Sequence, residues 1–200
     1  MDCGVVTRGT RVLITGPPSI GKTTICKKLI ALMENRNFNF DGFYTEEIRN
    51  QNGGRIGFDV VPLKNLNGRS ILARAGNLAG EVRNRGRRKP TIGNYCVFVD
   101  DFEKTALPIF DSNTDVLIID EIGKMELLSE KFFEAVSKLF QTNSKLPFII
   151  ATVPLMSKVK NSRKYSSFFE EIHKDKRSIV ITVNSQNRDK VPEQILQIIS

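Results

Sequence analysis

The chain has 200 residues and a formal net charge of +8, with 40% hydrophobic and 26% charged residues. This composition is typical of a globular domain with a full core, and it excludes a disordered chain. No apolar stretch approaches the roughly 18 residues of a membrane span, so we expect no membrane partner. Three cysteines without a C-x-x-C pair favour a reducing, cytoplasmic setting, and the nucleus is not excluded.

The first informative segment follows an N-terminal stretch, residues 1–10, that has no signal-peptide core and is expected to be a loose tail. We predict one domain over residues 11–200, which begins with a buried strand at residues 12–15. The next residues fit G-x-x-x-x-G-K-[ST], the phosphate-binding loop: Gly16, Pro17, Pro18, Ser19, Ile20, Gly21, Lys22 and Thr23. An apolar helical pattern then covers residues 22–33.

The order strand, glycine loop, helix is what this phosphate site requires. Backbone N–H groups and the helix N-terminus face the anion, and glycines permit the tight turn. Lys22 is predicted to reach the β- and γ-phosphates and to act in catalysis, while the Thr23 hydroxyl holds Mg²⁺. We include the next residue, Thr24, among the nucleotide-binding residues.

Residues 41–99 interrupt the alternation of strands and helices. Strands are predicted at 41–49 and 55–61, joined by a turn at 51–54, with a further strand at 94–99. Glycines and arginines dominate residues 63–93, where we expect loops. We interpret the whole segment as a β-rich insertion that lies over a P-loop core.

A second piece of chemistry follows an apolar run at residues 116–119, which is predicted to be a strand buried on both faces. Asp120 ends this strand, where open α/β sheets bind ligands, and would face the Mg²⁺. Glu121 would lie near the γ-phosphate and deprotonate or orient a water. The residues of this segment that we assign to nucleotide binding are Val116, Leu117, Ile118, Ile119, Asp120, Glu121, Ile122 and Gly123.

The rest of the chain returns to alternating elements. Helices are predicted at residues 129–140, with Ser129 as N-cap, at 162–173, and at 188–199, where Pro192 must lie near the first turn. Strands are predicted at residues 148–152 and 178–183. This pattern predicts an α/β fold with a mostly parallel sheet flanked by helices on both faces.

Several strings together resemble the small P-loop nucleoside-triphosphatases of the cancer-related type and their thermophile relatives. They lie at residues 16–24, 41–47, 55–61, 102–108 and 119–127, and the similarity runs from about Arg11 to the C-terminus. The resemblance implies slow, base-tolerant, Mg²⁺-dependent hydrolysis of nucleoside triphosphates to the diphosphate and phosphate. It also implies the P-loop class with a catalytic Glu and an additional strand between the phosphate loop and the Asp-Glu strand. Ser19 departs from the family, whose members often carry Gly there.

The cation that would complete the site is left open by the sequence. Candidates are Arg69, Arg74, Arg83, Arg85, Arg87, Arg88 and Lys124. Two alternatives to a triphosphatase also stay open: a nucleotide or small-molecule kinase, and an RNA-linked nucleotide switch. The second would use basic clusters at residues 69–89 and 158–177, although a positive field around a polyphosphate site is the simpler interpretation. We expect a monomer.

Overall fold

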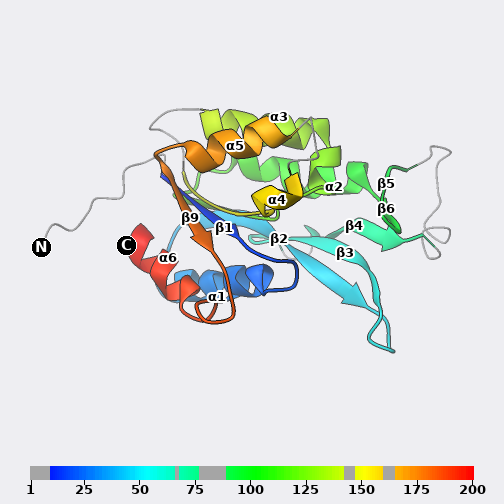
Figure 1. The fold of residues 1–200 in the computed structure, drawn as a ribbon, viewed down its shortest axis with the longest axis horizontal. Helices are drawn as coiled ribbons and strands as arrows, with labels where there is room; N and C mark the ends of the chain where they lie inside the picture. Colours follow the sequence, from blue (N-terminus) through cyan, green and yellow to red (C-terminus); the bar gives the residue numbers. More distant parts are fainter. Residues whose placement is uncertain (1–9, 66–67, 77–88, 142–146, 160–164) are drawn as a thin grey trace, which may run out of the picture.

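A nine-stranded sheet forms the centre of the computed structural model, which describes residues 10–65, 68–76, 89–141, 147–159 and 165–200 (Figure 1). The strand order is β5-β6-β4-β3-β2-β7-β8-β1-β9. Five neighbouring strands are parallel: β1(Arg11–Thr15), β2(Phe40–Arg49), β7(Val116–Asp120), β8(Phe148–Val153) and β9(Ser178–Thr182). Four antiparallel strands extend the sheet beyond β2: β3(Arg55–Pro62), β4(Ser70–Ala75), β5(Thr91–Ile92) and β6(Tyr95–Val97).

Helices cover both faces of this sheet. On one face lie α1(Lys22–Asn35) and α6(Val191–Ile199), and on the other α2(Val99–Ala106), α3(Glu130–Gln141) and α5(Ser166–Lys174) (Figure 1). Three shorter pieces complete the described helices: η2(Leu107–Asp111), η3(Glu126–Leu128) and α4(Met156–Val159). Every residue of β1, β7 and β8 is buried, as expected for parallel strands covered on both sides.

The predicted alternation of strands and helices is confirmed in the parallel half of the sheet. The predicted additional strand is confirmed as β8, which pairs with both β1 and β7 and so separates them. Ser129 caps α3, since its Oγ accepts a hydrogen bond from the Phe132 N–H at 3.0 Å. Pro192 lies in the first turn of α6, where its missing N–H has no helical acceptor to satisfy.

The β-rich segment requires two corrections. It does not lie over the core: β2 is itself a parallel strand beside β7, and β3, β4, β6 and β5 continue the same sheet in its plane. The expected loops at residues 63–93 are wrong for β4 and β5, and the expected strand at 94–99 is shorter because α2 begins at Val99. The apolar residues Val99, Phe102 and Ala106 are spaced as on one face of a helix. The prediction of a strand over residues 94–99 overlooked this signal.

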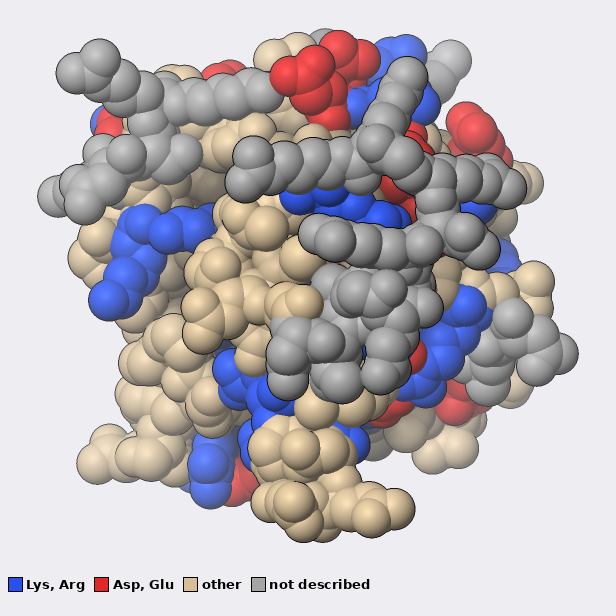
Figure 2. Space-filling view, turned by 90° about the vertical axis from the view of Figure 1, so that its right-hand side faces the viewer, with Lys and Arg blue, Asp and Glu red and all other residues tan. Residues whose placement is uncertain are grey.

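Basic side chains are scattered over the end of the molecule where β3 to β6 lie. Figure 2 shows them there in several separate groups with acidic side chains between them. Of the two basic clusters in the sequence, residues 77–88 and 160–164 lie outside the described residues, as does the predicted N-terminal tail up to residue 9. An RNA contact therefore stays a prediction. None of the described helices is long and apolar enough to cross a membrane.

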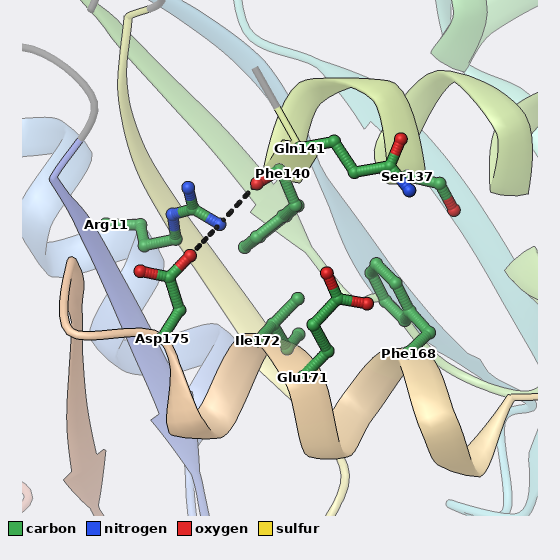
Figure 3. A pocket seen from close by; sticks show the side chains of 8 residues that line it. All are labelled: Arg11, Ser137, Phe140, Gln141, Phe168, Glu171, Ile172 and Asp175. Carbon is green, nitrogen blue, oxygen red and sulfur yellow. Dashed lines mark hydrogen bonds and ion pairs between the residues drawn. The ribbon is translucent and has the colours of Figure 1, made fainter. Parts of the chain in front are cut away.

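A buried arginine lies at the start of β1, at the end of the sheet away from the phosphate loop. The Arg11 side chain is 1% exposed, and its Nη1 donates to the Phe140 carbonyl at 2.8 Å and lies 3.6 Å from Asp175 Oδ2 (Figure 3). Its guanidinium also stacks over the Phe140 ring, 4.8 Å from the ring centre. The small pocket beside it is lined by Ser137, Phe140, Gln141, Phe168, Glu171, Ile172 and Asp175.

Candidate active site

The predicted site residues meet at one edge of the sheet. The carboxyl ends of the parallel strands lie together there, because Thr15 is in register with Val153 and Thr182, and Tyr44 with Asp120. The phosphate loop leaves β1 at this edge, and Glu121 follows β7 at the same edge. Ligands of open α/β sheets bind outside the carboxyl ends of the strands.

The phosphate loop has the backbone that its glycines allow. Gly21 has a φ of 107° and begins α1, and a Cβ at Gly16 would lie only 2.9 Å from the Val183 carbonyl oxygen. Ser19 also has a positive φ, 62°, at the position where the resembled family often carries Gly. The loop thus adopts at Ser19 a left-handed conformation that glycine takes more readily.

The first turn of α1 offers the anion-binding groups. Its first helical hydrogen bond runs from the Ile25 N–H to the Gly21 carbonyl, so the N–H groups of the three preceding residues remain for a ligand. Lys22 Nζ donates to the Gly16 carbonyl at 3.3 Å and so folds across the loop. Thr24 is exposed in this same turn.

Asp120 is 1% exposed at the end of β7. Its Oδ1 accepts a hydrogen bond of 2.7 Å from the hydroxyl of Thr152, on the neighbouring strand β8. Burial raises the pKa of Asp120, and the Thr152 hydroxyl, the Thr23 hydroxyl and the Lys22 ammonium lower it in part. Thr23 and Asp120, 97 residues apart in number, are therefore neighbours, as a shared metal requires.

The donor set at Asp120 fits Mg²⁺. Its second oxygen, Oδ2, is buried without a partner of hydrogen-bonding geometry among the described residues. Mg²⁺ prefers oxygen ligands and is commonly held by one or two protein groups, with substrate phosphates and waters completing its shell. In the described part of the chain no group of three His, Cys, Asp or Glu residues could hold a metal by itself, which is compatible with such a substrate-assisted site.

Three carboxyl groups, Asp120, Glu121 and Glu126, gather at the end of β7 and just after it. Burial raises the pKa of Glu121, the nearby Lys22 ammonium lowers it, and the Asp120 charge raises it. Glu126, 5% exposed, has its pKa raised to about 8 by burial and by the charge of Glu121. Both glutamates approach Gly123, where a Cβ would lie 2.8 Å from Glu126 Oε2 and 3.2 Å from Glu121 Oε1. A base with a pKa raised toward neutrality suits proton transfer near pH 7.

The other predicted residues of this segment have different surroundings. Val116, Leu117, Ile118 and Ile119 have at most 3% exposure and belong to the hydrophobic core, as does Ile122. Their packing holds Asp120 and Glu121 at the sheet edge. Among the candidate cations, Lys124 is exposed, and the four arginines from Arg83 to Arg88 lie outside the described residues.

Sequence reasoning missed two site residues, Thr152 and Glu126. Thr152 is fully buried in an apolar strand, and its contact with Asp120 exists only because β8 pairs with β7. A polar residue at the carboxyl end of a predicted parallel strand was the available signal. Glu126 lies in the string at residues 119–127 on which the resemblance rests, but its return toward Glu121 depends on the turn at η3.

Comparison with known proteins agrees with this geometry. A family model described as NTPase matches residues 11–196. The chain belongs to this NTPase family. The human cancer-related nucleoside-triphosphatase is 37% identical over 193 residues, which cover 92% of the chain and 94% of that protein. The nucleoside-triphosphatase THEP1 of Thermotoga maritima is also 37% identical over 193 residues, covering 94% and 95%.

The crystal structure of THEP1 from the hyperthermophile Aquifex aeolicus has the same fold. Its TM-score against this NTPase family member is 0.72 at 30% identity, and the match covers 95% of this chain and 99% of that one. Coverage this complete includes most of residues 41–99. The match therefore extends over most of the antiparallel part of the sheet, and the P-loop α/β class predicted from the sequence is confirmed.

Proposed function

We propose that the chain hydrolyses nucleoside 5′-triphosphates to the diphosphate and phosphate, with Mg²⁺, slowly and with little preference for the base. The observation that carries the proposal is the convergence of the phosphate loop, Asp120 and Glu121 at one edge of the sheet. The names of the relatives support base tolerance, since they specify nucleoside triphosphates in general.

Within this proposal, Thr23 and Asp120 would hold Mg²⁺, which when bound neutralises charge on the β- and γ-phosphates. The backbone N–H groups of the loop and the α1 N-terminus bind the phosphate oxygens. Lys22 exchanges its contact with the Gly16 carbonyl for a phosphate oxygen.

Glu121 is proposed to accept a proton from the attacking water. It is the partly exposed carboxylate of the group, whereas Asp120 and Glu126 are buried. A water can therefore reach Glu121 from the open side of the sheet edge. Burial raises the pKa of Glu121, which strengthens it as a base, and the Lys22 ammonium lowers that pKa in part.

Phosphate release from ATP, GTP, CTP and UTP tests the proposal, with Mg²⁺ or with excess chelator and no added acceptor. We expect release from all four triphosphates that stops with the chelator. Glu121→Gln should bind a fluorescent triphosphate analogue as the wild type does and lose hydrolysis by about 10²-fold or more. Glu47→Gln is the matched control, because Glu47 lies on β2 in ion pairs with Arg49 and Arg55 and is expected to leave the rate unchanged.

Two results would overturn this assignment. Phosphoryl transfer only when a nucleoside or small-molecule acceptor is added would make the protein a kinase. Undiminished hydrolysis by Glu121→Gln would remove the glutamate from its role as base. Stimulation by RNA that falls steeply with salt would instead favour an RNA-linked switch.

A further inference from the structure

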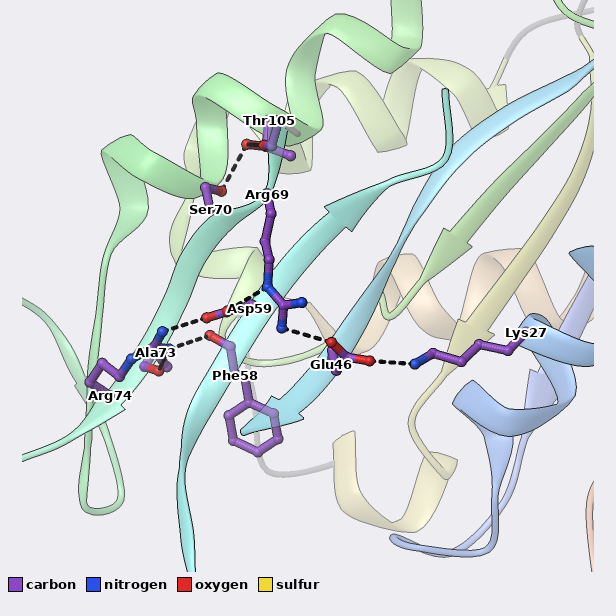
Figure 4. A network of polar contacts seen from close by, with 10 residues as sticks. Lys27, Glu46, Phe58, Asp59, Arg69, Ser70, Ala73, Arg74 and Thr105 are labelled. Carbon is purple, nitrogen blue, oxygen red and sulfur yellow. Dashed lines mark hydrogen bonds and ion pairs between the residues drawn. The ribbon is translucent and has the colours of Figure 1, made fainter. Parts of the chain in front are cut away.

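Five charged side chains form a continuous network on the α1 face of the sheet, just beyond Asp120 (Figure 4). One comes from α1, one from β2, one from β3, one from the loop before β4 and one from β4. In that order they are Lys27, Glu46, Asp59, Arg69 and Arg74. Three are cations and two are carboxylates, so the network carries one surplus positive charge.

The network begins where the phosphate site ends. Tyr44 is the register partner of Asp120, and Glu46 lies two residues farther along β2. Residues two apart on a strand point to the same face and are separated by about 7 Å along it. Lys27 follows Thr23 by four residues on α1, about one helical turn. Glu46 and Lys27 therefore lie next to the pair that would hold the metal.

Arg69 is the shared member of the network. Its Nη2 lies 2.7 Å from Glu46 Oε2 and its Nε 2.7 Å from Asp59 Oδ2. Each carboxylate has a second cation: Lys27 Nζ lies 2.6 Å from Glu46 Oε1, and Arg74 Nη2 lies 2.6 Å from Asp59 Oδ1. If Arg69 leaves, both carboxylates remain paired.

Each of the other two cations has a further contact outside the network, although Lys27, at 41%, is as exposed as Arg69. Arg74 is 16% exposed and also donates to the carbonyls of Phe58 at 3.0 Å and Ala73 at 2.9 Å. Lys27 lies over the Tyr44 ring, 4.4 Å from its centre. The polar contacts of Arg69 within the described residues are with the two carboxylates, and its side chain is 39% exposed. The pair of Arg69 with Glu46 joins two partly exposed side chains, 39% and 31% exposed, and such pairs contribute little to stability, so a triphosphate competes with Glu46 for this arginine.

We propose that Arg69 leaves Glu46 when a triphosphate binds and becomes the arginine that stabilises the transferring γ-phosphoryl group. This inference rests on the proposed hydrolysis. In that step the water oxygen bonds to the γ-phosphorus, and the bond between the γ-phosphorus and the β–γ bridging oxygen breaks. One proton of the water passes to Glu121, and the diphosphate leaves with the bridging oxygen. Arg69 exchanges no atom: its guanidinium donates hydrogen bonds to the phosphoryl oxygens as negative charge develops on them.

Steady-state hydrolysis by Arg69→Ala gives the first test. Arginines in this role raise rates by about 10³–10⁵ in other GTPases, so we expect kcat to fall at least about 10²-fold with KM little changed. Arg69→Lys keeps the charge without the bidentate geometry and should give an intermediate rate. Arg55→Ala is the matched control, since Arg55 pairs with Glu47 on the opposite face of the same hairpin and should leave kcat unchanged.

Two further measurements separate catalysis from a structural role. Guanidinium ion at millimolar concentration should restore part of the Arg69→Ala rate and none of the Glu121→Gln rate. Calorimetric titration should show that Arg69→Ala binds Mg²⁺ and ADP normally but loses the tight binding of Mg²⁺, ADP and aluminium fluoride, a mimic of the transferring phosphoryl group.

The second measurement tests Arg69 even if the wild type releases no phosphate, a result that would refute only the proposed hydrolysis. Wild-type affinity of Arg69→Ala for the aluminium fluoride complex would overturn the inference. So would an Arg69→Ala rate that equals that of Arg55→Ala. A fall in kcat without guanidinium rescue, together with lower stability in urea, would assign Arg69 to holding β2, β3 and β4 together.

Discussion

Glu121 and Glu126 direct their carboxylates to the same backbone position, beside the Cα of Gly123. Glu126 is buried, and burial together with the charge of Glu121 raises its pKa to about 8. With a pKa of about 8, Glu126 mostly carries its proton at neutral pH, which spares the site one negative charge next to a triphosphate.

The raised pKa of Glu126 predicts a stability that falls with pH. Its folded-state pKa of about 8 lies above the ordinary value of 4.5, so the folded state binds the proton more tightly. The stabilisation is complete below about pH 4.5 and is lost as the pH rises to about 8, at up to about 1.4 kcal/mol per pH unit. Urea unfolding of Glu126→Gln should lack this slope and give a more stable protein than the wild type at pH 9.

The control for this prediction is Glu34→Gln, which changes an exposed glutamate in α1. It should unfold with the pH dependence of the wild type. Equal slopes for Glu126→Gln and the wild type between pH 5 and 8 would show that Glu126 ionises normally in the folded protein.

The left-handed backbone at Ser19 predicts a stabilising glycine substitution. A non-glycine residue in this conformation costs about 1–2 kcal/mol. Glycine removes this cost, but it also raises the entropy of the unfolded chain, which offsets about 0.4–1 kcal/mol of the gain. Ser19→Gly should therefore raise the free energy of unfolding by about 0.5–1 kcal/mol in urea. Asn37→Gly is the comparison: Asn37 has a φ of 55°, but asparagine tolerates this region, so its gain should be smaller. A loss of stability in Ser19→Gly would contradict the argument.

The parts of the site that lie in continuous strings could be predicted from the sequence. The phosphate loop and the Asp120-Glu121 pair each combine a local backbone requirement with the residues that use it, so position and chemistry appear together. The order of β1, β8 and β7 came from the resemblance, and the paired registers confirm it.

The features that the sequence did not reveal depend on contacts between segments far apart in the chain. The strand β4 has arginine at Arg74 and flanking glycines, so its composition indicates a loop, and only its pairing with β3 and β6 makes it a strand. Arg69 was one of seven candidate cations in the sequence. The structure distinguishes it, since Glu46 and Asp59, which are register partners on β2 and β3, both form ion pairs with its guanidinium.

The buried Arg11 predicts a loss of stability without a loss of activity. Arg11→Ala leaves the Phe140 carbonyl without its donor and empties the space over the Phe140 ring. Asp175 stays paired with Arg177 at 2.7 Å, so the substitution leaves no buried charge without a partner. We therefore expect the free energy of unfolding in urea to fall by about 2–4 kcal/mol. Arg11→Met keeps the apolar stem and should recover part of it. Arg11 begins β1 at the end of the strand away from the phosphate loop. A change in kcat would therefore contradict the prediction that Arg11 affects stability alone.

The hydrogen bond from Thr152 to Asp120 predicts a weaker response to Mg²⁺ when it is removed. Thr152→Val preserves the shape of a fully buried side chain but deletes the hydroxyl that donates to Asp120 Oδ1. That hydrogen bond lowers the pKa of Asp120, so without it the carboxylate is harder to ionise and less well oriented. Groups that orient a metal ligand typically change metal affinity by about 10–100-fold, and we expect that increase in the Mg²⁺ concentration for half-maximal hydrolysis.

Lower pH should enlarge the effect of Thr152→Val, because protons compete with Mg²⁺ for Asp120 as the pH falls toward its raised pKa. Thr152→Ser retains the hydroxyl and should keep a Mg²⁺ response close to that of the wild type, which separates the hydrogen bond from the packing of the methyl group. The measurement is the Mg²⁺ concentration for half-maximal hydrolysis at pH 6 and pH 8, determined for the wild type, Thr152→Val and Thr152→Ser. If Thr152→Val and Thr152→Ser shift the titration equally, packing at β8 sets the metal response and the hydroxyl does not.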